Sequence, residues 1–420
     1  MKLKVNTLAA LDIGTSKICS LIAEMDEETQ EPIIKGFGVA PSKGIKKGSV
    51  VNIEETTKSI IQAVSDAEKM SGYTISHCYV SITGDHIRSM NTRGAIAISR
   101  GSRTGLGEPR EIEQEDIERV IEHTKSVPLP VDRQILHVIP QEFIIDEQTG
   151  IKSPINLSGR RLEAKVHLTT YSTIVTSNLS RCIKNAELEV ERFVLQSLAA
   201  SYSVLEEDEK ELGTILIDIG SGTIDIIVYY DGGVHYTGVV NLGGFSVTND
   251  IAYLLRIPLV KAESIKREHG CAITSLSDKG ANFKIDGLGG RPPREISIDT
   301  LTEYIEPRME EIFREAYLEA RKADISLKNT LAIVLTGGGA LLKGSEQLAE
   351  NIFNSSARIG YPKGFQGATE EINNPSFATS VGLLKFAIEE RKSISTYQQT
   401  LKGPLPKLRT WIKNLSENVM

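Results

Sequence analysis

The sequence predicts an α/β protein whose two similar halves face a shared cleft. With 420 residues, the chain exceeds the size at which one hydrophobic core stops growing, so two or more domains are expected. A buried strand, an Asp-Ile-Gly turn and a second buried strand occur twice, with equivalent aspartates at Asp12 and Asp218. A further apolar strand runs directly into Gly337, Gly338 and Gly339. Two unrelated tight hairpins are the alternative to a true repeat.

The composition excludes several classes of protein. Hydrophobic residues make up 40% of the chain and charged residues 25%, as in ordinary soluble domains. The net charge of −7 argues against a general nucleic-acid binder, which is usually basic. The four cysteines lie far apart and are expected to be reduced core thiols of a cytosolic protein. We expect no signal peptide and no spanning helix of about 20 apolar residues, so membrane contact should be peripheral.

The first half begins with the hairpin at 8–23, and strands and helices are expected to follow it. They are a strand at 33–39, an amphipathic helix at 53–72 that stops at Gly72, and a strand at 78–83. Residues 84–167 break this rhythm and should form an inserted α+β module, with a helix near 113–124 and strands at 95–99, 134–140 and 142–145. The main body resumes with a strand at 171–176, a helix near 179–186, a helix opening within 193–201, and a solvated turn at 206–211.

The second half begins with the hairpin at 216–228 and continues through another glycine turn at Gly243 and Gly244. The elements expected after that turn are helices at 247–255 and 261–269, two or three short strands, a long helix at 303–322, a buried strand at 330–336 and a helix at 344–353. A last core helix starts within 375–384, and the folded body is expected to end near Glu390.

The glycine turns have the properties of a phosphate-binding site. Glycine leaves backbone N–H groups accessible, and successive N–H groups in a tight turn surround an anion. The two hairpins would hold the β- and γ-phosphates of a nucleotide from opposite sides, and the turn at Gly337 would pass close to the adenosine. The chain has no Walker A pattern and no GxGxxG after its first strand, so P-loop and Rossmann sites are excluded.

These turns resemble the nucleotide-binding motifs of the actin/Hsp70/sugar-kinase superfamily. The phosphate 1, phosphate 2 and adenosine motifs are matched by residues 12–15, 218–223 and 336–339. The two connecting motifs resemble the helix starts at 196–200 and 378–382. All five occur in the superfamily's order and cover most of the chain. The resemblance therefore implies an actin-like two-domain ATPase fold with repeated halves around a nucleotide cleft.

Within this superfamily, the chain resembles the FtsA family of bacterial cell-division proteins. The matching segments are residues 12–17, 137–141, 262–266 with 269–272, and 306–308. The insert at 84–167 has the place and size of the extra α+β subdomain typical of FtsA. The turn from Asn241 to Gly244 is closer to the chaperone-like version, which leaves the ribose contacts open.

The resemblance divides the chain into nine segments. They are the first part of domain 1 (1–83), the inserted subdomain (84–167), the rest of domain 1 (168–205), the core of domain 2 (206–256), its outer subdomain (257–329), the rest of that core (330–375), a closing helix of domain 1 (376–390), a flexible linker (391–403) and a membrane-targeting helix (404–420).

The resemblance also implies roles for single residues. Asp12 and Asp218 would position Mg²⁺ through water, and Gln196 would orient the attacking water; an amide is a poor base, so any ATPase activity would be slow. The residues expected to contact ATP are Gly14, Thr15, Ser16, Lys17, Gly220, Ser221, Gly222, Thr223, Gly243, Gly244, Glu263, Lys266, Gly337, Gly338 and Gly339. Three alternatives stay open: Gln196 as a helix-start residue bonded to backbone, Lys17 as a solvated lysine, and Glu263 with Lys266 as a surface ion pair.

The C-terminal stretch predicts a membrane contact. Residues 404–420 form an amphipathic pattern in which the apolar side chains fall within an arc of about 120°. Fifteen helical residues reach only about 22 Å, so such a helix lies in the membrane interface. The residues expected to bind the membrane are Leu405, Leu408, Arg409, Trp411, Ile412, Lys413 and Leu415. Three basic groups at about 1 kcal/mol each form a weak anchor, which holds firmly when many copies bind together. A helix that docks on the protein's own core or on a partner is the alternative.

The implied function is assembly at the cytoplasmic face of the bacterial inner membrane, at the division septum. The chain would bind ATP and Mg²⁺, polymerise, anchor the ring of the tubulin-like FtsZ and recruit later division proteins. Its partners would be FtsZ, further copies of itself, later cell-division proteins and anionic lipids, with no nucleic acid. A phosphotransferase, phosphatase or ATPase of the superfamily is one rival, but nothing in the spacing of Asp116, Asp132 and Asp146 marks a catalytic base. A pilus- or shape-type actin-like protein is the other.

Overall fold

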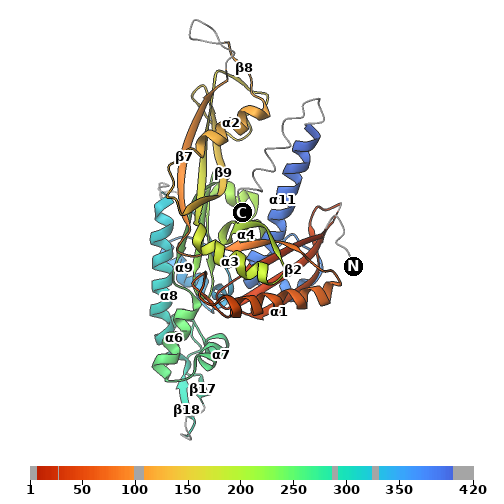
Figure 1. Cartoon of the computed structure of the whole chain (residues 1–420). Coiled ribbons are helices and arrows are strands. Elements are labelled where there is room, and N and C mark those ends of the chain that lie inside the picture. The colour runs from red at the N-terminus through yellow and green to blue at the C-terminus, as the bar shows by residue number, and fades with distance from the viewer. Residues whose placement is uncertain (1–6, 27, 99–107, 286–291, 324–330, 401–420) are drawn as a thin grey trace.

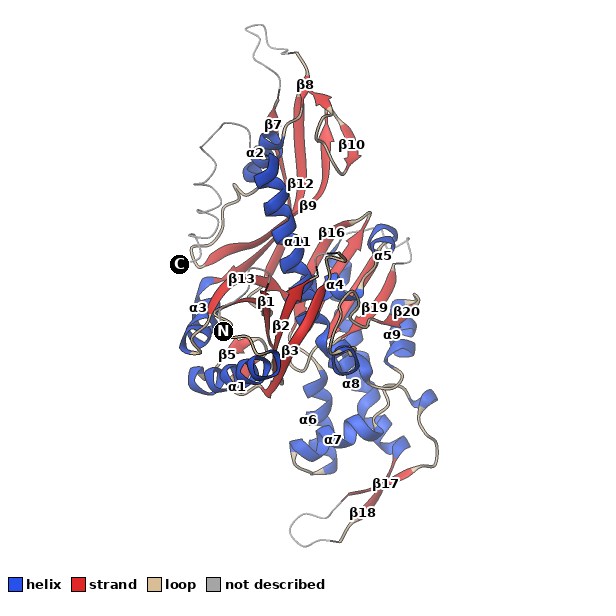
Figure 2. Cartoon of the chain, turned by 90° about the vertical axis from the view of Figure 1, so that its right-hand side faces the viewer, coloured by secondary structure: helices blue, strands red, loops and turns tan. Residues whose placement is uncertain are grey.

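The structure is a computed structural model that describes residues 7–26, 28–98, 108–285, 292–323 and 331–400. Two five-stranded sheets lie at its centre (Figure 2). The first has the order β13-β6-β1-β2-β3 and consists of β1 (Thr7–Ile13), β2 (Lys17–Met25), β3 (Pro32–Pro41), β6 (His77–Ile82) and β13 (Glu189–Leu195). The second has the order β16-β15-β14-β19-β20 and consists of β14 (Thr214–Ile219), β15 (Ile224–Tyr230), β16 (Gly233–Val240), β19 (Ala332–Thr336) and β20 (Ala357–Ile359).

The two sheets repeat one pattern of pairing. β1 is antiparallel to β2 and parallel to β6, and β14 is antiparallel to β15 and parallel to β19 in the same way. Each predicted hairpin is therefore the central ribbon of its own sheet. The predicted fold of two repeated α/β halves is confirmed, and the alternative of two unrelated hairpins is wrong.

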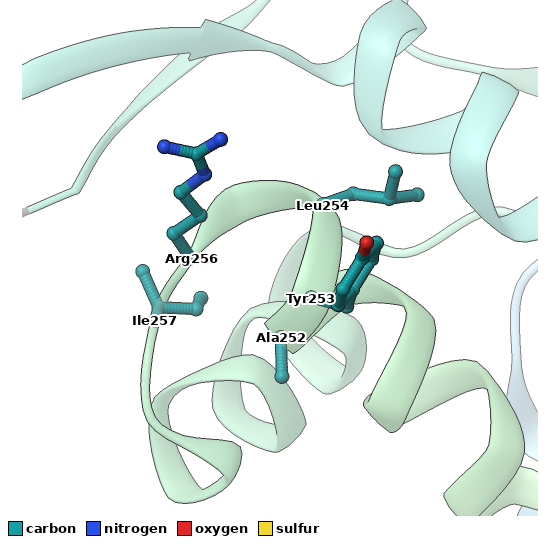
Figure 3. Close-up of a pocket in the computed structure, with 5 residues that line it drawn as sticks. All are labelled: Ala252, Tyr253, Leu254, Arg256 and Ile257. Carbon is teal, nitrogen blue, oxygen red and sulfur yellow. The ribbon is translucent and has the colours of Figure 1, made fainter.

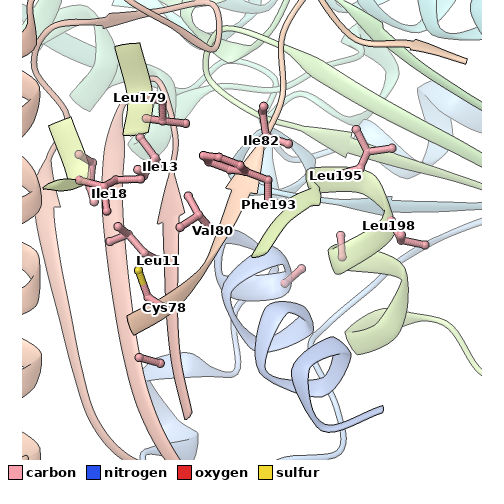
Figure 4. Close-up of a cluster of buried hydrophobic side chains, with 14 of the residues drawn as sticks. Leu11, Ile13, Ile18, Cys78, Val80, Ile82, Leu179, Phe193, Leu195 and Leu198 are labelled. Atoms are coloured by element: carbon pink, nitrogen blue, oxygen red, sulfur yellow. The ribbon is translucent and has the colours of Figure 1, made fainter. Parts of the chain in front are cut away.

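Both faces of the first sheet are buried, because helices cover each of them. Alternate residues of β1 point to opposite faces: Leu11 packs toward α1 (Ile53–Ser71) and α3 (Thr173–Asn185), and Ala10 packs toward α11 (Ala378–Thr400). Figure 4 shows the first of these clusters, where Leu11, Ile18 and Val80 meet residues of β13 and α3. The four cysteines are buried and free of disulfides.

Helix α1 shows why the predicted amphipathic stretch folds as expected. Asn52 caps its N-terminus by accepting a hydrogen bond from the backbone of Glu55, and Gly72 ends it with a left-handed φ of 74°. The apolar residues between these caps recur at helical spacing and are buried against the sheet. The prediction of this helix and of its stop at Gly72 is confirmed.

The insert forms an arm above the two sheets (Figure 1). Its four-stranded sheet has the order β10-β9-β12-β7, and α2 (Gln114–Thr124) packs on one face over a core of its own. The strands of the insert are β7 (Arg88–Ala97), β8 (Arg110–Glu111), β9 (Arg133–Ile145), β10 (Gln148–Ile151), β11 (Ser158–Gly159) and β12 (Arg161–Ser172). Near the first sheet lie the short β4 (Ile45–Lys46) and β5 (Ser49–Val50).

The outer part of domain 2 extends to the opposite end of the molecule (Figure 2). It contains α6 (Gly244–Leu255), α7 (Leu259–His269), β17 (Asn282–Ile285) and β18 (Arg294–Ser297). From there α8 (Ile298–Ala320) returns to pack on β15 and β16, and α9 (Ser345–Phe353) packs on β19 and β20.

Two helices link the halves. α4 (Gln196–Val204) contacts both β13 and β14, and α11 packs closely along α4. Where they cross, a Cβ placed on Gly382 would overlap the carbonyl group of Ala199. Only glycine fits at this crossing.

The structure differs from the sequence-based assignment at several places. Strand β16 and most of strand β12 have no counterpart in that assignment. Pro140 does not divide β9, because the strand absorbs it at a bulge where pairing with β12 shifts by one residue. Helix α3 starts at Thr173, so the strand predicted at 171–176 is wrong beyond Ser172. β13 occupies Glu189–Leu195, where the predicted helix begins too early. The run expected as a solvated turn at 206–211 holds α5 (Glu207–Leu212), which starts with a capping box between Glu206 and Glu209. Finally, α11 continues to Thr400, ten residues into the predicted linker, because no Gly or Pro interrupts it before Gly403.

Candidate functional site

Two buried aspartates lie at equivalent places in the two sheets. Asp12 is 8% exposed near the end of β1, and Asp218 is 2% exposed near the end of β14. Parallel neighbours end at the same edge, where open α/β sheets bind their ligands. Ser81 on β6 donates a hydrogen bond of 2.7 Å to Asp12 Oδ1, and Ser380 on α11 donates one of 3.3 Å to Oδ2.

Asp218 is held by the two linking helices. Gln196, the first residue of α4, donates its amide to Asp218 Oδ2 at 3.1 Å. Thr379 at the start of α11 donates its hydroxyl to the same oxygen at 3.1 Å. Gln196 thus begins a helix, as one prediction held, but its amide is directed at a carboxylate of the site.

Burial makes these carboxylates hard to ionise. Desolvation raises the pKa of Asp218 to about 6, and the nearby charge of Asp12 adds to the effect. Desolvation also raises the pKa of Asp12, although Ser81 and Lys17 oppose it. A third carboxylate, Asp225 on β15, is fully buried, and desolvation and the charge of Asp218 raise its pKa well above the usual range. The site therefore favours a positive charge beside these groups.

The two predicted phosphate hairpins have the same turn and contact each other. The N–H of Gly14 donates to the carbonyl of Lys17 at 3.0 Å, and the N–H of Gly220 donates to that of Thr223 at 2.9 Å. A Cβ on Gly222 would lie 2.7 Å from Thr15 Oγ1. The structure thus brings together two hairpins whose aspartates are 206 residues apart.

The triple-glycine turn lies against the end of β14. Gly337 has a left-handed φ of 80°, and a Cβ there would overlap Asp218 Oδ1. A Cβ on Gly339 would overlap the side chain of Ile219, whereas on Gly338 the nearest atom would be Ser376 Cβ at 3.9 Å. Gly338 is therefore the member of the turn with open space beside it.

The predicted residues Gly243, Gly244, Glu263 and Lys266 form one group next to the second hairpin. The N–H of Gly244 donates to the carbonyl of Gly220 at 2.9 Å, and a Cβ on Gly243 would lie 2.6 Å from the carbonyl oxygen of Ser221. Lys266 pairs with Glu263 at 2.7 Å and donates to the carbonyl of Gly244 at 2.9 Å. Burial raises the pKa of Glu263, but hydrogen bonds from Lys266 and Thr248 outweigh it and the pKa falls to about 2. The ion pair is thus tied to the start of α6.

Lys17 and Ser16 lie in the first hairpin. The Lys17 ammonium donates to the carbonyl of Ser376 at 2.5 Å and to its hydroxyl at 3.1 Å, and it lies 4.0 Å from the ring centroid of Phe377. Ser16 is exposed at the turn. Lys17 is thus bonded to the segment that opens α11, and it is not the solvated lysine of the alternative prediction.

Sequence reasoning missed two groups at the site. Asp225 faces Asp218 across the hairpin and accepts a 2.6 Å hydrogen bond from Thr83 of the first half. A lone acid inside an apolar strand was the available signal. His137 on β9 accepts a 3.0 Å hydrogen bond from the N–H of Leu195, directly before Gln196, and burial lowers its pKa to about 3. A single buried histidine has no spacing that identifies it.

Of the three acids in the insert that could serve a phosphotransferase, Asp116 and Asp146 have structural partners for their carboxylates, whereas the side chain of Asp132 is exposed. Asp116 is 2% exposed and accepts two hydrogen bonds from Arg110 at the start of α2. Asp146 accepts hydrogen bonds from the backbone of Arg160 and Arg161. The backbone carbonyl of Asp132 accepts a hydrogen bond from the N–H of Thr173.

Three further observations bound the site within the described residues. No three His, Cys, Asp or Glu side chains there are grouped to hold a metal ion directly. No helix in the described ranges is long and apolar enough to cross a membrane. A shallow pocket, shown in Figure 3, lies at the C-terminal end of α6, where the core of domain 2 passes into its outer subdomain, and is apart from the aspartates. The predicted membrane helix at 404–420 lies outside the described residues.

Known proteins match both the main body and the insert. The family model "Cell division protein FtsA" matches residues 215–382, and "SHS2 domain inserted in FTSA" matches residues 84–170. Cell division protein FtsA of Pseudomonas aeruginosa is 40% identical over 415 residues, which are 97% of each chain. That of Borreliella burgdorferi is 43% identical over 388 residues, which are 92% of each chain.

Solved structures share the fold at low identity. The PilM–PilN type IV pilus biogenesis complex matches with a TM-score of 0.65 at 16% identity, covering 91% of this chain and 98% of that chain. MreB5 of Spiroplasma citri bound to ADP matches with a TM-score of 0.55 at 13% identity, covering 93% and 99%. These likenesses establish an actin-like fold. With relatives this similar along nearly the whole sequence, the chain belongs to the FtsA family of cell division proteins.

Proposed function

We propose that this chain binds ATP and Mg²⁺ between its two halves. The observation that carries the proposal is the contact between the two glycine hairpins at Gly222 and Thr15, directly beside Asp12 and Asp218. Two facing hairpins offer backbone N–H groups to phosphates from both sides. Buried carboxylates with raised pKa values fit a hydrated divalent cation, which would supply the missing positive charge.

The proposed contacts follow from the positions of the groups. The hairpins at 14–17 and 220–223 would hold the phosphates, Gly338 would allow the backbone to approach the adenosine, and Gly243, Gly244, Glu263 and Lys266 would border it. Asp12 and Asp218 would hold the water shell of Mg²⁺. Gln196 would orient a water for attack on the γ-phosphate, and because its amide is a weak base, turnover would be slow.

Nucleotide binding is tested with substitutions in two of the glycine turns, at Gly338, which has open space beside it, and at Gly222, which faces Thr15. Gly338→Asp or Gly222→Asp places a carboxylate where phosphate or adenosine should lie, so ATP binding measured by calorimetry should be abolished. Unchanged affinity in a folded variant would refute this cleft.

We further propose that the chain polymerises at the cytoplasmic face of the inner membrane, anchors the FtsZ ring and recruits later division proteins. Membership of the FtsA family supports this role. The amphipathic pattern at 404–420 supports the anchor, and the domain limits given from the sequence remain part of this proposal. Deleting residues 404–420 should remove co-sedimentation with anionic liposomes; undiminished binding would contradict the anchor.

The two rivals are less well supported. Asp116 and Asp146 are engaged in structural contacts, which disfavours a phosphotransferase that would need a free base in the insert. The pilus protein shares only the fold at 16% identity, whereas relatives named FtsA are about 40% identical. An ATPase assay combined with a liposome-binding assay separates the candidates, because fast turnover without lipid binding would favour an enzyme.

A further inference from the structure

The outer edge of β16 is bonded to the insert. β16 is the last strand of the second sheet and pairs with β15 on one side only (Figure 2). On its other side, polar side chains of the insert donate hydrogen bonds to its carbonyls: Ser89 to Thr237 at 2.7 Å, Asn91 to His235 at 3.0 Å and Gln141 to Val234 at 2.7 Å. Since the insert belongs to the first half, these bonds join the two halves.

His167 lies at the centre of this contact. It is 1% exposed on β12, with Nδ1 at 2.8 Å from Asn91 Oδ1 and Nε2 at 2.9 Å from Thr237 Oγ1. The bond from Asn91 Nδ2 to the carbonyl of His235 fixes the Asn91 amide, so its Oδ1 must accept from Nδ1–H of the ring. His167 Nε2 must then accept a hydrogen bond from the hydroxyl of Thr237. His167 thus donates to Asn91 and accepts from Thr237.

Thr237 connects His167 to the second phosphate hairpin. Thr237 pairs with Ile227 on β15, and three residues further along the same ladder Val240 pairs with Ile224, directly after Thr223 of the hairpin. At about 3.3 Å per residue, the contact is about 10 Å from the hairpin along continuously paired strands. A shift of β16 should therefore move the hairpin as well, because only paired strands lie between the two.

Two more bonds continue the same row toward the cleft. Thr83 donates to Asp225 at 2.6 Å, and Asn241 donates to Asp85 at 3.2 Å. Both join residues 83–85, where the chain enters the insert, to the second half: Asp225 lies on β15 and Asn241 directly follows β16. The insert contacts and the hairpin contacts thus form one continuous interface between the halves.

We propose that His167 is a positioning residue of the nucleotide site: through Thr237 it holds the second phosphate hairpin in place against the first. The inference rests on the proposed nucleotide function. It has a consequence for regulation, because coupling between two sites is reciprocal. A partner that binds the insert and displaces β12 would change the affinity for ATP, and ATP would change the affinity for that partner by the same factor.

The test uses two substitutions that keep different nitrogens of the ring. His167→Gln places an amide oxygen near the position of Nε2 and keeps the acceptor for Thr237, whereas His167→Asn reaches only the position of Nδ1. Thr237→Val removes the hydroxyl with little change in shape. Tyr171→Phe is the matched control, since it removes a partly buried 2.7 Å hydrogen bond from the same strand to Gln134 that does not involve β16.

ATP affinity of the full chain is measured by calorimetry with Mg²⁺. We expect His167→Asn and Thr237→Val to bind ATP about tenfold more weakly, the equivalent of about 1.4 kcal/mol, and His167→Gln and Tyr171→Phe to bind like the wild type. Equal affinities in all five proteins would overturn the inference. Equal weakening in His167→Gln and His167→Asn would overturn it as well, because the effect would then follow from general loss of packing.

Hydrogen exchange without nucleotide separates this inference from the proposed function. His167→Asn should speed exchange of the amides at 220–223 and 233–240, and His167→Gln should not. If the wild type fails to bind ATP but exchange follows this pattern, the proposed function fails and the positioning role stands. If exchange at 220–223 is the same in all variants, the positioning role fails even when the wild type binds ATP.

Discussion

Replacing Asp218 by Asn should make the protein more stable and less able to bind nucleotide. The carboxylate is 2% exposed, and its pKa is raised from 3.8 to about 6, so the fold disfavours its charge. At 1.36 kcal/mol for each pH unit, this difference corresponds to about 3 kcal/mol at pH 7 and above. Asn carries no charge, and its one carbonyl oxygen can take the position of Oδ2, which accepts the hydrogen bonds of both Gln196 and Thr379. Perturbed carboxylates of this kind are typical of functional sites.

The sign of the pH dependence follows from the raised pKa. The folded state prefers the protonated carboxyl, so the contribution of Asp218 to stability is most favourable below pH 3.8 and is lost as the pH rises through about 6. The stability gained by Asp218→Asn should therefore be about 1 kcal/mol at pH 4.5 and approach its full size, up to about 3 kcal/mol, at pH 8. Asp12 and Asp225 titrate in both proteins, which is why the difference between the two proteins is the quantity to compare.

Urea denaturation of the nucleotide-free protein between pH 4.5 and pH 8 measures this difference. Asp208→Asn, an exposed residue of α5, is the control for loss of one charge. Calorimetry with ATP and Mg²⁺ on the same samples should show that the stabilised variant has lost binding. A gain in stability that does not change with pH, or a variant less stable than the wild type at pH 8, would refute the reasoning.

Three further predictions concern the turn, the insert and the ion pair. Gly337→Ala should destabilise domain 2 by more than the 1–2 kcal/mol or so of a left-handed residue, because its Cβ would overlap Asp218, whereas Gly338→Ala should leave the urea midpoint nearly unchanged. Asp116→Ala leaves Arg110 without its buried partner and should lower the free energy of unfolding by about 3–5 kcal/mol. Hydrogen exchange should become faster in α2, while ATP affinity should stay within about twofold of the wild type. Weakened ATP binding would contradict the independence of the insert core from the nucleotide site. Lys266→Met removes the bond to the Gly244 carbonyl and leaves Glu263 paired with the exposed Arg267. Thermal unfolding should then begin in the outer subdomain, which local hydrogen exchange measures. Unchanged exchange in that subdomain would contradict a structural role for the Glu263–Lys266 pair.

Local sequence patterns are sufficient to predict the hairpins. They fail to predict secondary structure where tertiary contacts determine whether a segment is a strand or a helix. Apolar runs on both sides of Asp12 and Asp218 identify buried strands, and the glycines between them identify the turns. The stretch after Tyr171 is rich in β-branched residues and was assigned to a strand, yet packing against α1 makes it helical from Thr173. β13 was missed because its alternating residues run without a turn into Gln196, so no local signal separates strand from helix.

The part of the site that is formed by the glycine turns and by Asp12 and Asp218 could be predicted from the sequence. The facing of Thr15 and Gly222 follows from the repeat, but the bond from Gln196 to Asp218 depends on how α4 lies between the sheets. His137 bonds to Leu195, 58 positions away, and His167 bonds to Thr237, 70 positions away; no spacing in the sequence records such contacts. The same holds for Lys17: its hydrogen bond to Ser376, which lies 359 positions away, could not be predicted from the sequence.

The close crossing of Gly382 on Ala199 gives the molecule a pivot. Two helices in such contact can rotate about one another but have little freedom to slide, since the carbonyl of Ala199 occupies the space that any side chain would need. Displacement then grows with distance from the crossing, so a small angular change at the aspartates becomes a large movement at the far ends of the molecule. Those ends are the insert on one side and β17 with β18 on the other (Figure 1). A rotation about this crossing would therefore displace these two ends most.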